Sequence, residues 1–310
     1  MIKNIAVLGC GLIGASWAAF FASKGLRTKM FDIDSATTKR GRDQAVKYLH
    51  RLVELNSIPQ ESLDEAVSNL QSVNSYQELL QDCDYVQESV LEDYDVKAEV
   101  YRTLEQHLST EAIIASSSSG LLMSQMQLAL EYPLRSLIAH PFNPPHIIPL
   151  VELVPGEKTA SETVSAVNDF FIQLGKKPVV LNKEVPGHIA NRLAAAVWRE
   201  AIALLDDDVA SLEDIDNALC HGPGLRWALM GQHLIYELGG GEGGYQKFID
   251  TIGASFSTYW EDMQSWTEIP ESAKTKAVAG TKELLETRSR EQWTKWRDEK
   301  LVKIIQILEE

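Results

Sequence analysis

Short apolar runs alternate with longer stretches of helical periodicity through the first half of the chain. The apolar runs predict strands at residues 2–8, 27–32, 85–88, 113–115, 137–139, 150–154 and 178–181. Apolar positions at helical spacing predict helices at 12–24, 36–55, 61–70, 96–107 and 161–174. This alternation of strand and helix is typical of an α/β fold with a doubly wound, mainly parallel Rossmann-type sheet.

The pattern changes after Pro186-Gly187. Apolar residues then recur at helical spacing only, beginning with Ile189, Leu193 and Val197, and convincing strand patterns disappear. We therefore predict two domains: a Rossmann domain at residues 1–185 and a smaller, all-helical domain at residues 186–310.

Composition narrows the classes of partner and site. The 310 residues carry a formal net charge of -15, which argues against a nucleic-acid or anionic-membrane surface. The three cysteines are far apart and form no C-x-x-C pair, so we expect no zinc site, no metal and no disulfide framework. No signal peptide or membrane span is apparent, so we expect a soluble, cytoplasmic protein.

Residues 9–14 read G-x-G-x-x-G between a predicted strand and a predicted helix. Gly9 permits a tight turn, Gly11 lets backbone amides approach a pyrophosphate, and Gly14 allows close packing of helix on sheet. Leu12 and Ile13 complete the cofactor-binding loop, at a helix N-terminus that stabilises a phosphate. A glycine turn without a ligand is the alternative for such a pattern taken alone, but the strand, the helix and Asp32 are all in place.

Asp32 ends the second predicted strand, where an acidic side chain can hydrogen-bond both ribose hydroxyls of a dinucleotide. The same carboxylate would repel a 2′-phosphate, and the next two residues supply no arginine to bind one. The sequence therefore predicts NAD, in preference to NADP, as the cofactor.

Three segments place polar residues at the ends of predicted strands, where a nicotinamide would lie. They are the four serines at 116–119, His140 in the run H-P-F-N-P-P, and Glu152. Oxidation of an alcohol requires a base, and a histidine oriented by a carboxylate suits that role. His140 and Glu152 could form this pair if their strands turn back on each other. His140 as a structural histidine and the serines as a polar turn remain open, and no other histidine has comparable neighbours in sequence.

These segments together resemble the 3-hydroxyacyl-CoA dehydrogenase family along essentially the whole chain. The motifs that carry the resemblance are G-x-G-x-x-G at 9–14, E-S-V-L-E at 88–92 with Lys97, S-S-S-S-G at 116–120, H-P-F-N-P at 140–144, P-L-V-E-L-V at 149–154 and P-G-H-I-A-N-R at 186–192. One departure is His188, where an aromatic residue commonly follows the glycine.

The resemblance implies roles for individual residues. It makes His140 the base and Glu152 its partner, while Ser119 and Asn191 would hold the substrate oxygen and the nicotinamide region. Glu88, Glu92 and Lys97 would lie along the cofactor. The resemblance also implies Asn143 as a substrate-binding residue and a homodimer formed through the C-terminal helices.

Within the family, some members act on acyl-CoA thioesters and others on small free hydroxy acids. The runs S-S-S-S-G-L-L, W-R-E-A at 198–201 and G-L-R-W-A at 224–228 look most like the L-carnitine dehydrogenase branch, and residues 178–184 also resemble the L-gulonate dehydrogenase/lambda-crystallin branch. Arg226 and Trp227 could clamp a carboxylate and face a quaternary ammonium group, or Trp227 and Trp198 could be core residues.

We therefore expect hydride transfer between NAD and the 3-hydroxyl carbon of a small hydroxy acid. The alternatives are a short-chain 3-hydroxyacyl-CoA substrate and a non-catalytic, crystallin-like structural protein. Lys39, Arg40, Arg42, Lys47 and Arg51 could bind CoA phosphates, although a solvated face of mixed charge explains them as well. Sequence leaves the exact substrate and the physiological direction open.

Overall fold

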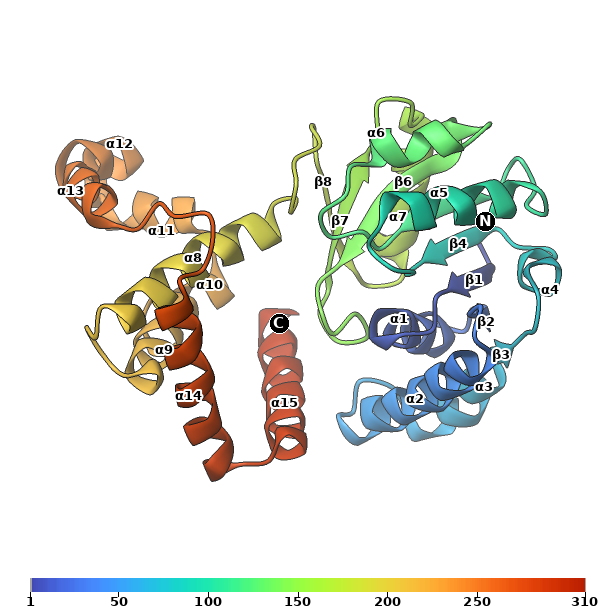
Figure 1. Cartoon of the computed structure of the whole chain (residues 1–310), viewed down its shortest axis with the longest axis horizontal. Coiled ribbons are helices and arrows are strands. Elements are labelled where there is room, and N and C mark those ends of the chain that lie inside the picture. Colours follow the sequence, from blue (N-terminus) through green and yellow to red (C-terminus); the bar gives the residue numbers. More distant parts are fainter. Residues whose placement is uncertain (1, 310) are drawn as a thin grey trace. The chain divides into compact units, whose positions relative to one another are not determined.

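The computed structural model describes residues 2–309, which form two compact units that divide between Arg192 and Leu193 (Figure 1). The strands are β1 (Asn4–Leu8), β2 (Arg27–Phe31), β3 (Leu70–Ser72), β4 (Tyr85–Glu88), β5 (Ile113–Ser116), β6 (Ser136–Pro141), β7 (Leu150–Pro155) and β8 (Lys177–Val180).

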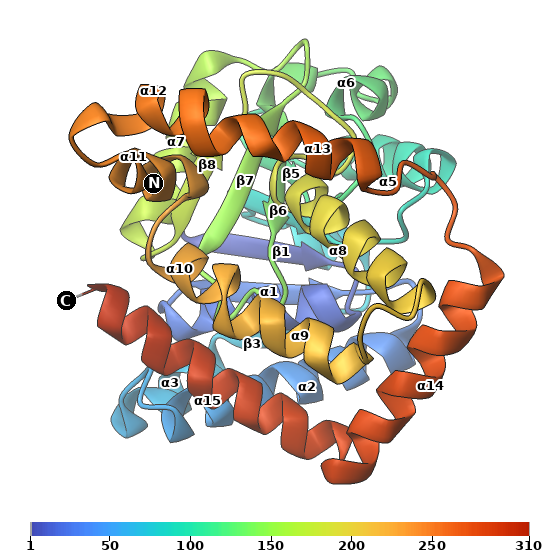
Figure 2. The ribbon, with the colours of Figure 1, turned by 90° about the vertical axis from the view of Figure 1, so that its left-hand side faces the viewer.

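Helices of the first unit are α1 (Leu12–Ser23), α2 (Ser35–Glu54), α3 (Leu63–Ser68), α4 (Tyr76–Leu80), α5 (Tyr94–Glu105), α6 (Met123–Met126) and α7 (Ser161–Gln173), with short 3-10 turns at Gln60–Ser62, Gln127–Ala129 and Pro133–Arg135. Helix α8 (Ala190–Asp206) begins in the first unit. The second unit adds α9 (Leu212–His221), α10 (Pro223–Leu229), α11 (Gln232–Gly239), α12 (Gly244–Phe248), α13 (Ala254–Asp262), α14 (Glu271–Thr287) and α15 (Arg290–Glu309), with a 3-10 turn at Gly241–Gly243 and a π-helical turn at Ile249–Gly253 (Figure 2).

All eight strands belong to one sheet in the order β3-β2-β1-β4-β5-β6-β7-β8. Every neighbouring pair is parallel except β6 and β7, which are antiparallel. The strand order reverses between β1 and β4, and ligands of open α/β sheets bind beyond the carboxyl ends of the strands at such a point. The predicted Rossmann-type fold is therefore confirmed.

Successive residues of each strand point to opposite faces of the sheet, and each face has its own core. Ile5 and Val7 of β1 join a cluster with α1, α2, α3 and α7, whereas Ala6 and Leu8 join a cluster with α4, α5 and α6. Figure 1 shows α1 and α2 on one side of the strands and α5 and α6 on the other. This alternation explains why the buried strands read as continuous apolar runs in the sequence.

The predicted elements of the first unit differ from the structure in two places. The helix expected at 61–70 ends at Ser68, because Leu70–Ser72 forms an edge strand paired with β2. The short helices α4 and α6 were not predicted, since five and four residues are too few to display a helical period.

The second unit is helical, as its apolar spacing indicates. The two units divide between Arg192 and Leu193, inside α8, whereas the sequence pattern predicted a boundary at residue 185. Few of its apolar side chains are buried: Ile202, Ala203, Ile235, Phe248, Ala273 and Val302. Trp198 and Trp227 are 57% and 40% exposed, so within this chain neither is a core residue.

No helix within residues 2–309 combines the length and apolar character that crossing a membrane requires. The same residues contain no cluster of three or more His, Cys, Asp or Glu side chains suited to a metal ion.

Gly41 of α2 offers a test of the close packing above the nucleotide loop. A Cβ atom at this position would lie 2.4 Å from the Cys10 carbonyl oxygen and 2.7 Å from the Cys10 Cβ. Alanine favours a helix over glycine by about 1 kcal/mol, but overpacking costs about 1–3 kcal/mol. We expect Gly41→Ala to lower the melting temperature, with a net loss of up to about 2 kcal/mol.

The matched control is Lys39→Ala, an exposed position two residues earlier on the same helix. This control should melt within a degree or two of the unchanged protein, because surface substitutions usually shift stability by less than about 0.5 kcal/mol. A Gly41→Ala protein as stable as the control would show that α2 can move away from the loop freely.

Candidate active site

The predicted functional segments meet at one edge of the sheet. The glycine loop follows β1, the 88–92 segment follows β4, and the serines follow β5. His140 lies near the end of β6, which runs parallel to β5. Because β1, β4, β5 and β6 are parallel, all four segments leave the sheet at its carboxyl edge, as an α/β site requires.

The glycine loop has the geometry of a dinucleotide site. Gly9 has φ +87, and a Cβ there would lie 2.5 Å from the Ser89 carbonyl oxygen. A Cβ on Gly14 would lie 1.8 Å from the Gly9 carbonyl oxygen, so both positions require glycine. Gly11 has no neighbouring atom within 4 Å of its Cβ position, and no side chain caps α1. The amides at the start of this helix therefore remain available to a pyrophosphate.

Asp32 supports the glycine loop. Its Oδ2 accepts a hydrogen bond from the Cys10 amide at 2.9 Å, and its Oδ1 accepts one from the Asp34 amide at 3.2 Å. Each carboxylate oxygen can accept more than one hydrogen bond, so acceptor capacity remains for ribose hydroxyls. The residues present fit a bound NAD.

His140 and Glu152 face each other directly across the antiparallel β6–β7 pair. Nδ1 of His140 lies 2.8 Å from Oε2 of Glu152, and the two residues are 6% and 1% exposed. Since a carboxylate only accepts, Nδ1 carries the proton and Nε2 keeps its lone pair. No group within residues 2–309 hydrogen-bonds to that Nε2, which leaves it able to accept a proton from a substrate hydroxyl.

The second oxygen of Glu152 is held by the start of α8. Oε1 accepts hydrogen bonds from the amides of Ile189 at 2.8 Å and Ala190 at 2.9 Å. Burial opposes ionisation, but the hydrogen bonds from His140, Ala190 and Ile189 outweigh it and lower the pKa of Glu152. A lowered pKa means that this carboxylate stabilises the fold at neutral pH. That contribution is lost only as the pH falls through the lowered value.

The serine loop is organised by Glu92. Its Oε1 accepts hydrogen bonds from the Ser118 hydroxyl at 2.6 Å and from the amides of Ser119 and Gly120 at 2.8 and 2.9 Å. Burial alone would raise the pKa of Glu92, but the bonds from Ser118 and Gly120, the charge of Lys97 and the Ser119 amide lower it. Ser119 is exposed and its hydroxyl has no partner within residues 2–309, so it is available to a ligand.

Glu88 and Lys97 lie beneath this loop with almost no exposed surface. Lys97 Nζ is 2.7 Å from Glu88 Oε1, and the other Glu88 oxygen accepts bonds from Ser116 at 2.7 Å and Tyr101 at 3.2 Å. A buried pair is retained only when its remaining polar atoms are satisfied, as they are here. Glu88 and Lys97 therefore support the loop from below, whereas Glu92 lies nearer the surface. Their contact with a cofactor remains a prediction.

The remaining predicted residues are more dispersed. Asn191 is partly buried near the start of α8, one residue beyond the amides that hold Glu152, and Asn143 is exposed in the loop after β6. Arg226 and Trp227 lie on α10 of the second unit, where the Trp227 indole donates to the Gln232 side chain. Their roles toward a substrate remain predictions.

The cations of α2 are largely engaged with their own helix and its neighbours. Arg40 pairs with Asp34, Arg51 pairs with Glu54, and the Arg42 guanidinium donates to the Leu70 carbonyl. These contacts favour the solvated mixed-charge face over a CoA phosphate site.

Buried residues that sequence reasoning missed hold the segments around His140. Lys176 donates to the carbonyls of Pro145 and Ile148, at 2.7 Å for the latter, and burial lowers its pKa to about 7. Ser16 of α1 bonds both the ring, at 2.7 Å, and the backbone of His146. Sequence neighbours did not single out His188 as part of the site, yet its ring lies beside His140 with centroids 5.1 Å apart. Its place after Gly187 was the available signal.

Comparison with protein families matches both parts of the chain. Residues 4–185 match the 3-hydroxyacyl-CoA dehydrogenase NAD binding domain, and residues 187–279 match the C-terminal domain of the same family. The chain is 36% identical over 309 residues to an L-carnitine dehydrogenase of Nocardiopsis dassonvillei, covering 100% of this chain and 92% of that relative. It is 34% identical over 311 residues to one of Oceanobacillus iheyensis, covering 100% and 99%.

Solved structures show the same relationship. A 5-formyl-3-hydroxy-2-methylpyridine 4-carboxylic acid 5-dehydrogenase, described as an NAD⁺-dependent dismutase, matches with TM-score 0.83 and 30% identity, covering 100% of this chain and 99% of that one. FadB2 of M. tuberculosis matches with TM-score 0.72 and 27% identity, covering 90% and 94%.

These matches extend over both units and include the glycine loop and the strands that carry His140 and Glu152. The protein is accordingly an NAD-dependent oxidoreductase that acts on a CH–OH group. The chain belongs to the 3-hydroxyacyl-CoA dehydrogenase family.

Proposed function

We propose that this protein oxidises the 3-hydroxyl group of a small, free hydroxy acid of the carnitine type, or reduces the corresponding ketone. The observation that carries the chemistry is the His140–Glu152 pair, whose Nδ1···Oε2 distance of 2.8 Å leaves Nε2 available as a base. The substrate class is supported by the full-length resemblance to L-carnitine dehydrogenases at about one third identity.

In this proposal each residue has a stated task. His140 Nε2 takes the hydroxyl proton, and ionised Glu152 fixes the imidazole tautomer and stabilises the imidazolium. Ser119 and Asn191 orient the substrate oxygen and the nicotinamide region. Bound NAD supplies the acceptor for the hydride of the substrate carbon. The first-turn amides of α1 and the loop residues Gly9, Gly11, Leu12, Ile13 and Gly14 hold the pyrophosphate, and Asp32 holds the ribose.

The substrate's charged groups would be recognised by Asn143, Arg226 and Trp227. Arginine binds a carboxylate with paired N–H donors, and an indole face attracts a quaternary ammonium group. Trp227 is 40% exposed, so its ring presents surface to a ligand. A 3-hydroxyacyl-CoA substrate is the second candidate, since a 3-hydroxybutyryl-CoA dehydrogenase and a 3-hydroxyacyl-CoA dehydrogenase share the fold. The intact active-site set of Ser119, His140, Glu152 and Asn191 favours either enzyme over a crystallin-like structural protein.

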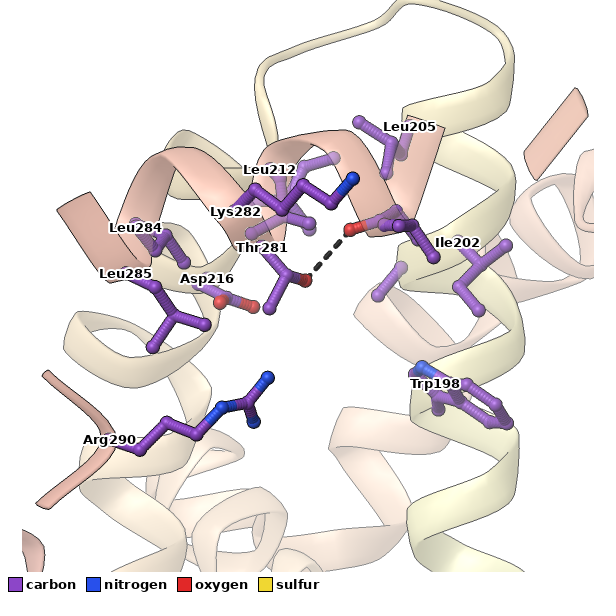
Figure 3. Close-up of a pocket in the computed structure, with 14 residues that line it drawn as sticks. Trp198, Ile202, Leu205, Leu212, Asp216, Thr281, Lys282, Leu284, Leu285 and Arg290 are labelled. Atoms are coloured by element: carbon purple, nitrogen blue, oxygen red, sulfur yellow. Dashed lines mark hydrogen bonds between the residues drawn. The ribbon is translucent and has the colours of Figure 1, made fainter. Parts of the chain in front are cut away.

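We also propose a cytoplasmic homodimer formed through the helical unit. A cavity of 560 Å³ opens among α8, α9, α14 and α15, and its lining is mainly apolar (Figure 3). Trp198, Leu212 and Leu285 line it beside the charged groups of Asp216, Lys282 and Arg290. A unit with so few buried apolar residues gains stability when a second copy covers such surface. A monomer mass measured by sedimentation equilibrium at micromolar protein concentration would contradict this proposal.

The substrate is tested by a panel of L-carnitine, L-gulonate, 3-hydroxybutyrate and 3-hydroxybutyryl-CoA, with NAD reduction followed by absorbance. We expect a free hydroxy acid to show the highest kcat/KM. If the protein turns over only the thioester, and if neutralising Lys39, Arg40 and Arg42 lowers that turnover, the substrate is an acyl-CoA instead.

His140→Gln tests the base. General-base assistance contributes about 10²–10⁴-fold, so we expect kcat to fall by that order while the NADH dissociation constant stays nearly unchanged. Glu152→Gln should also lower kcat, and the double variant should be little slower than His140→Gln because the two residues act as a unit. Oxidation by the unchanged protein should slow as pH falls, since a protonated imidazole accepts no proton. Near-normal turnover by folded His140→Gln would remove His140 from the mechanism.

Asp32→Ala tests cofactor selection. The carboxylate repels a 2′-phosphate and binds the ribose, so its loss should raise KM for NAD and narrow the ratio of kcat/KM between NAD and NADP. Because Asp32 also accepts from the Cys10 amide, Asp32→Asn should retain more NAD affinity than Asp32→Ala. A clear preference of the unchanged protein for NADP would contradict the assignment.

A further inference from the structure

His188 is a buried imidazole that the proposed mechanism does not use. It is 1% exposed, and its ring is tilted by 58° to the His140 ring, with centroids 5.1 Å apart. It lies between the glycine turn at Gly187 and the two amides that hold Glu152. Both His188 and the groups around it belong to the first unit.

The hydrogen bonding of His188 defines its tautomer. Nε2 lies 3.0 Å from the Ser118 carbonyl oxygen, and because a carbonyl only accepts, Nε2 carries the proton. The backbone of His188 has φ +51, in the left-handed region, and its amide donates to the Val185 carbonyl at 3.0 Å. Histidine enters this region more readily than most side chains, so the turn directs the ring inward at modest cost.

His188 and Glu92 together hold the peptide unit between Ser118 and Ser119. The carbonyl oxygen of this unit, on Ser118, accepts a hydrogen bond from His188, and its N–H, on Ser119, donates to Glu92 Oε1 at 2.8 Å. With both polar ends held, the peptide plane has a fixed orientation. The direction of the exposed Ser119 hydroxyl therefore depends on His188 as well as on Glu92.

We propose that His188 is a positioning residue, which holds the Ser118–Ser119 peptide against the His140–Glu152 pair and acts only as the neutral imidazole protonated on Nε2. This inference rests on the proposed function, because it assigns His188 to the same reaction. It adds a second histidine whose protonation state controls that reaction without contact to substrate.

The surroundings keep His188 neutral. Burial lowers its pKa, the Ser118 carbonyl opposes that shift, and the neighbouring His140 of β6 lowers the pKa further. Glu152 of β7 and Glu92 before α5 act in the opposite direction, yet Glu152 already binds His140 and two amides. Nδ1 of His188 is buried and has no hydrogen-bond partner within residues 2–309, so a proton there would have no acceptor.

Two protonations should therefore suppress oxidation on the acidic side. A proton on His140 removes the base, and a proton on His188 adds a second positive charge beside it and an unpaired buried N–H. On the acidic side, the slope of log kcat/KM against pH should rise from one toward two as the pH falls, because two protons are then bound. A residue with only a packing role would leave that limb unchanged.

The experiment compares His188→Phe with His188→Gln in the full-length protein. Phenylalanine keeps an aromatic ring but lacks the donor, whereas the glutamine amide nitrogen can occupy the place of Nε2 and donate to Ser118. His107→Phe, at an exposed position, is the matched control for removal of a histidine. The measurements are kcat, KM for each substrate, the NADH dissociation constant, the pH–rate profile and the melting temperature.

We expect His188→Phe to lower kcat roughly tenfold, as loss of one buried hydrogen bond does, with NADH affinity unchanged. His188→Gln should recover most of kcat, and both variants should show an acidic limb of a single proton. If His188→Phe fails to fold, the slope of the acidic limb of His188→Gln tests the inference by itself. The control should match the unchanged protein in every measurement.

The inference is overturned if His188→Phe folds with unchanged kcat, or if the acidic limb of either variant still steepens toward two protons. Absence of any turnover by the unchanged protein would instead overturn the proposed function. In that event, ¹⁵N NMR of the His188 ring still tests the inference. A proton on Nδ1 in place of Nε2 at neutral pH contradicts it.

Discussion

A buried carboxylate is stable only when both of its oxygens have partners, and Glu152 finds them on two different segments. One oxygen binds the His140 ring on the adjacent strand, and the other binds two amides at the start of α8. Burial of this charge therefore couples the tautomer of His140 to the position at which α8 begins.

Much of the first unit could be predicted from sequence because its patterns are local. The strand-helix alternation and the glycine loop each lie within a short window, and the structure shows both. The approach of His140 to Glu152 could only be stated as a condition, because it depends on β6 and β7 being antiparallel in an otherwise parallel sheet. Edge strand β3 was misassigned because three residues next to a helix carry too little periodicity.

Other parts of the site depend on contacts between distant segments, which sequence spacing does not reveal. His188 reaches a carbonyl 70 residues earlier, and Lys176 reaches carbonyls about 30 residues before it. Lys176 has no pattern around it in the sequence, and His188 stands out there only as a departure from the family motif. The same limit applies to Arg226 and Trp227, whose chemistry suits a charged substrate. Their roles depend on the helical unit, where the sequence predicts which segments are helices but not which helices pack together.

The antiparallel pairing of β6 with β7 also affects how the chain reaches this arrangement. His140 and Glu152 are 12 residues apart, whereas Glu152 and the Ile189 amide are 37 residues apart. By loop-closure entropy, the shorter connection is favoured by roughly 1 kcal/mol before any contact energy is counted. The two strands that carry His140 and Glu152 thus lie in one short stretch of chain, whereas the amides at the start of α8 come after β8 in the sequence. In kinetic terms, loop closure favours contact of the reactive histidine with its partner ahead of the contact with α8.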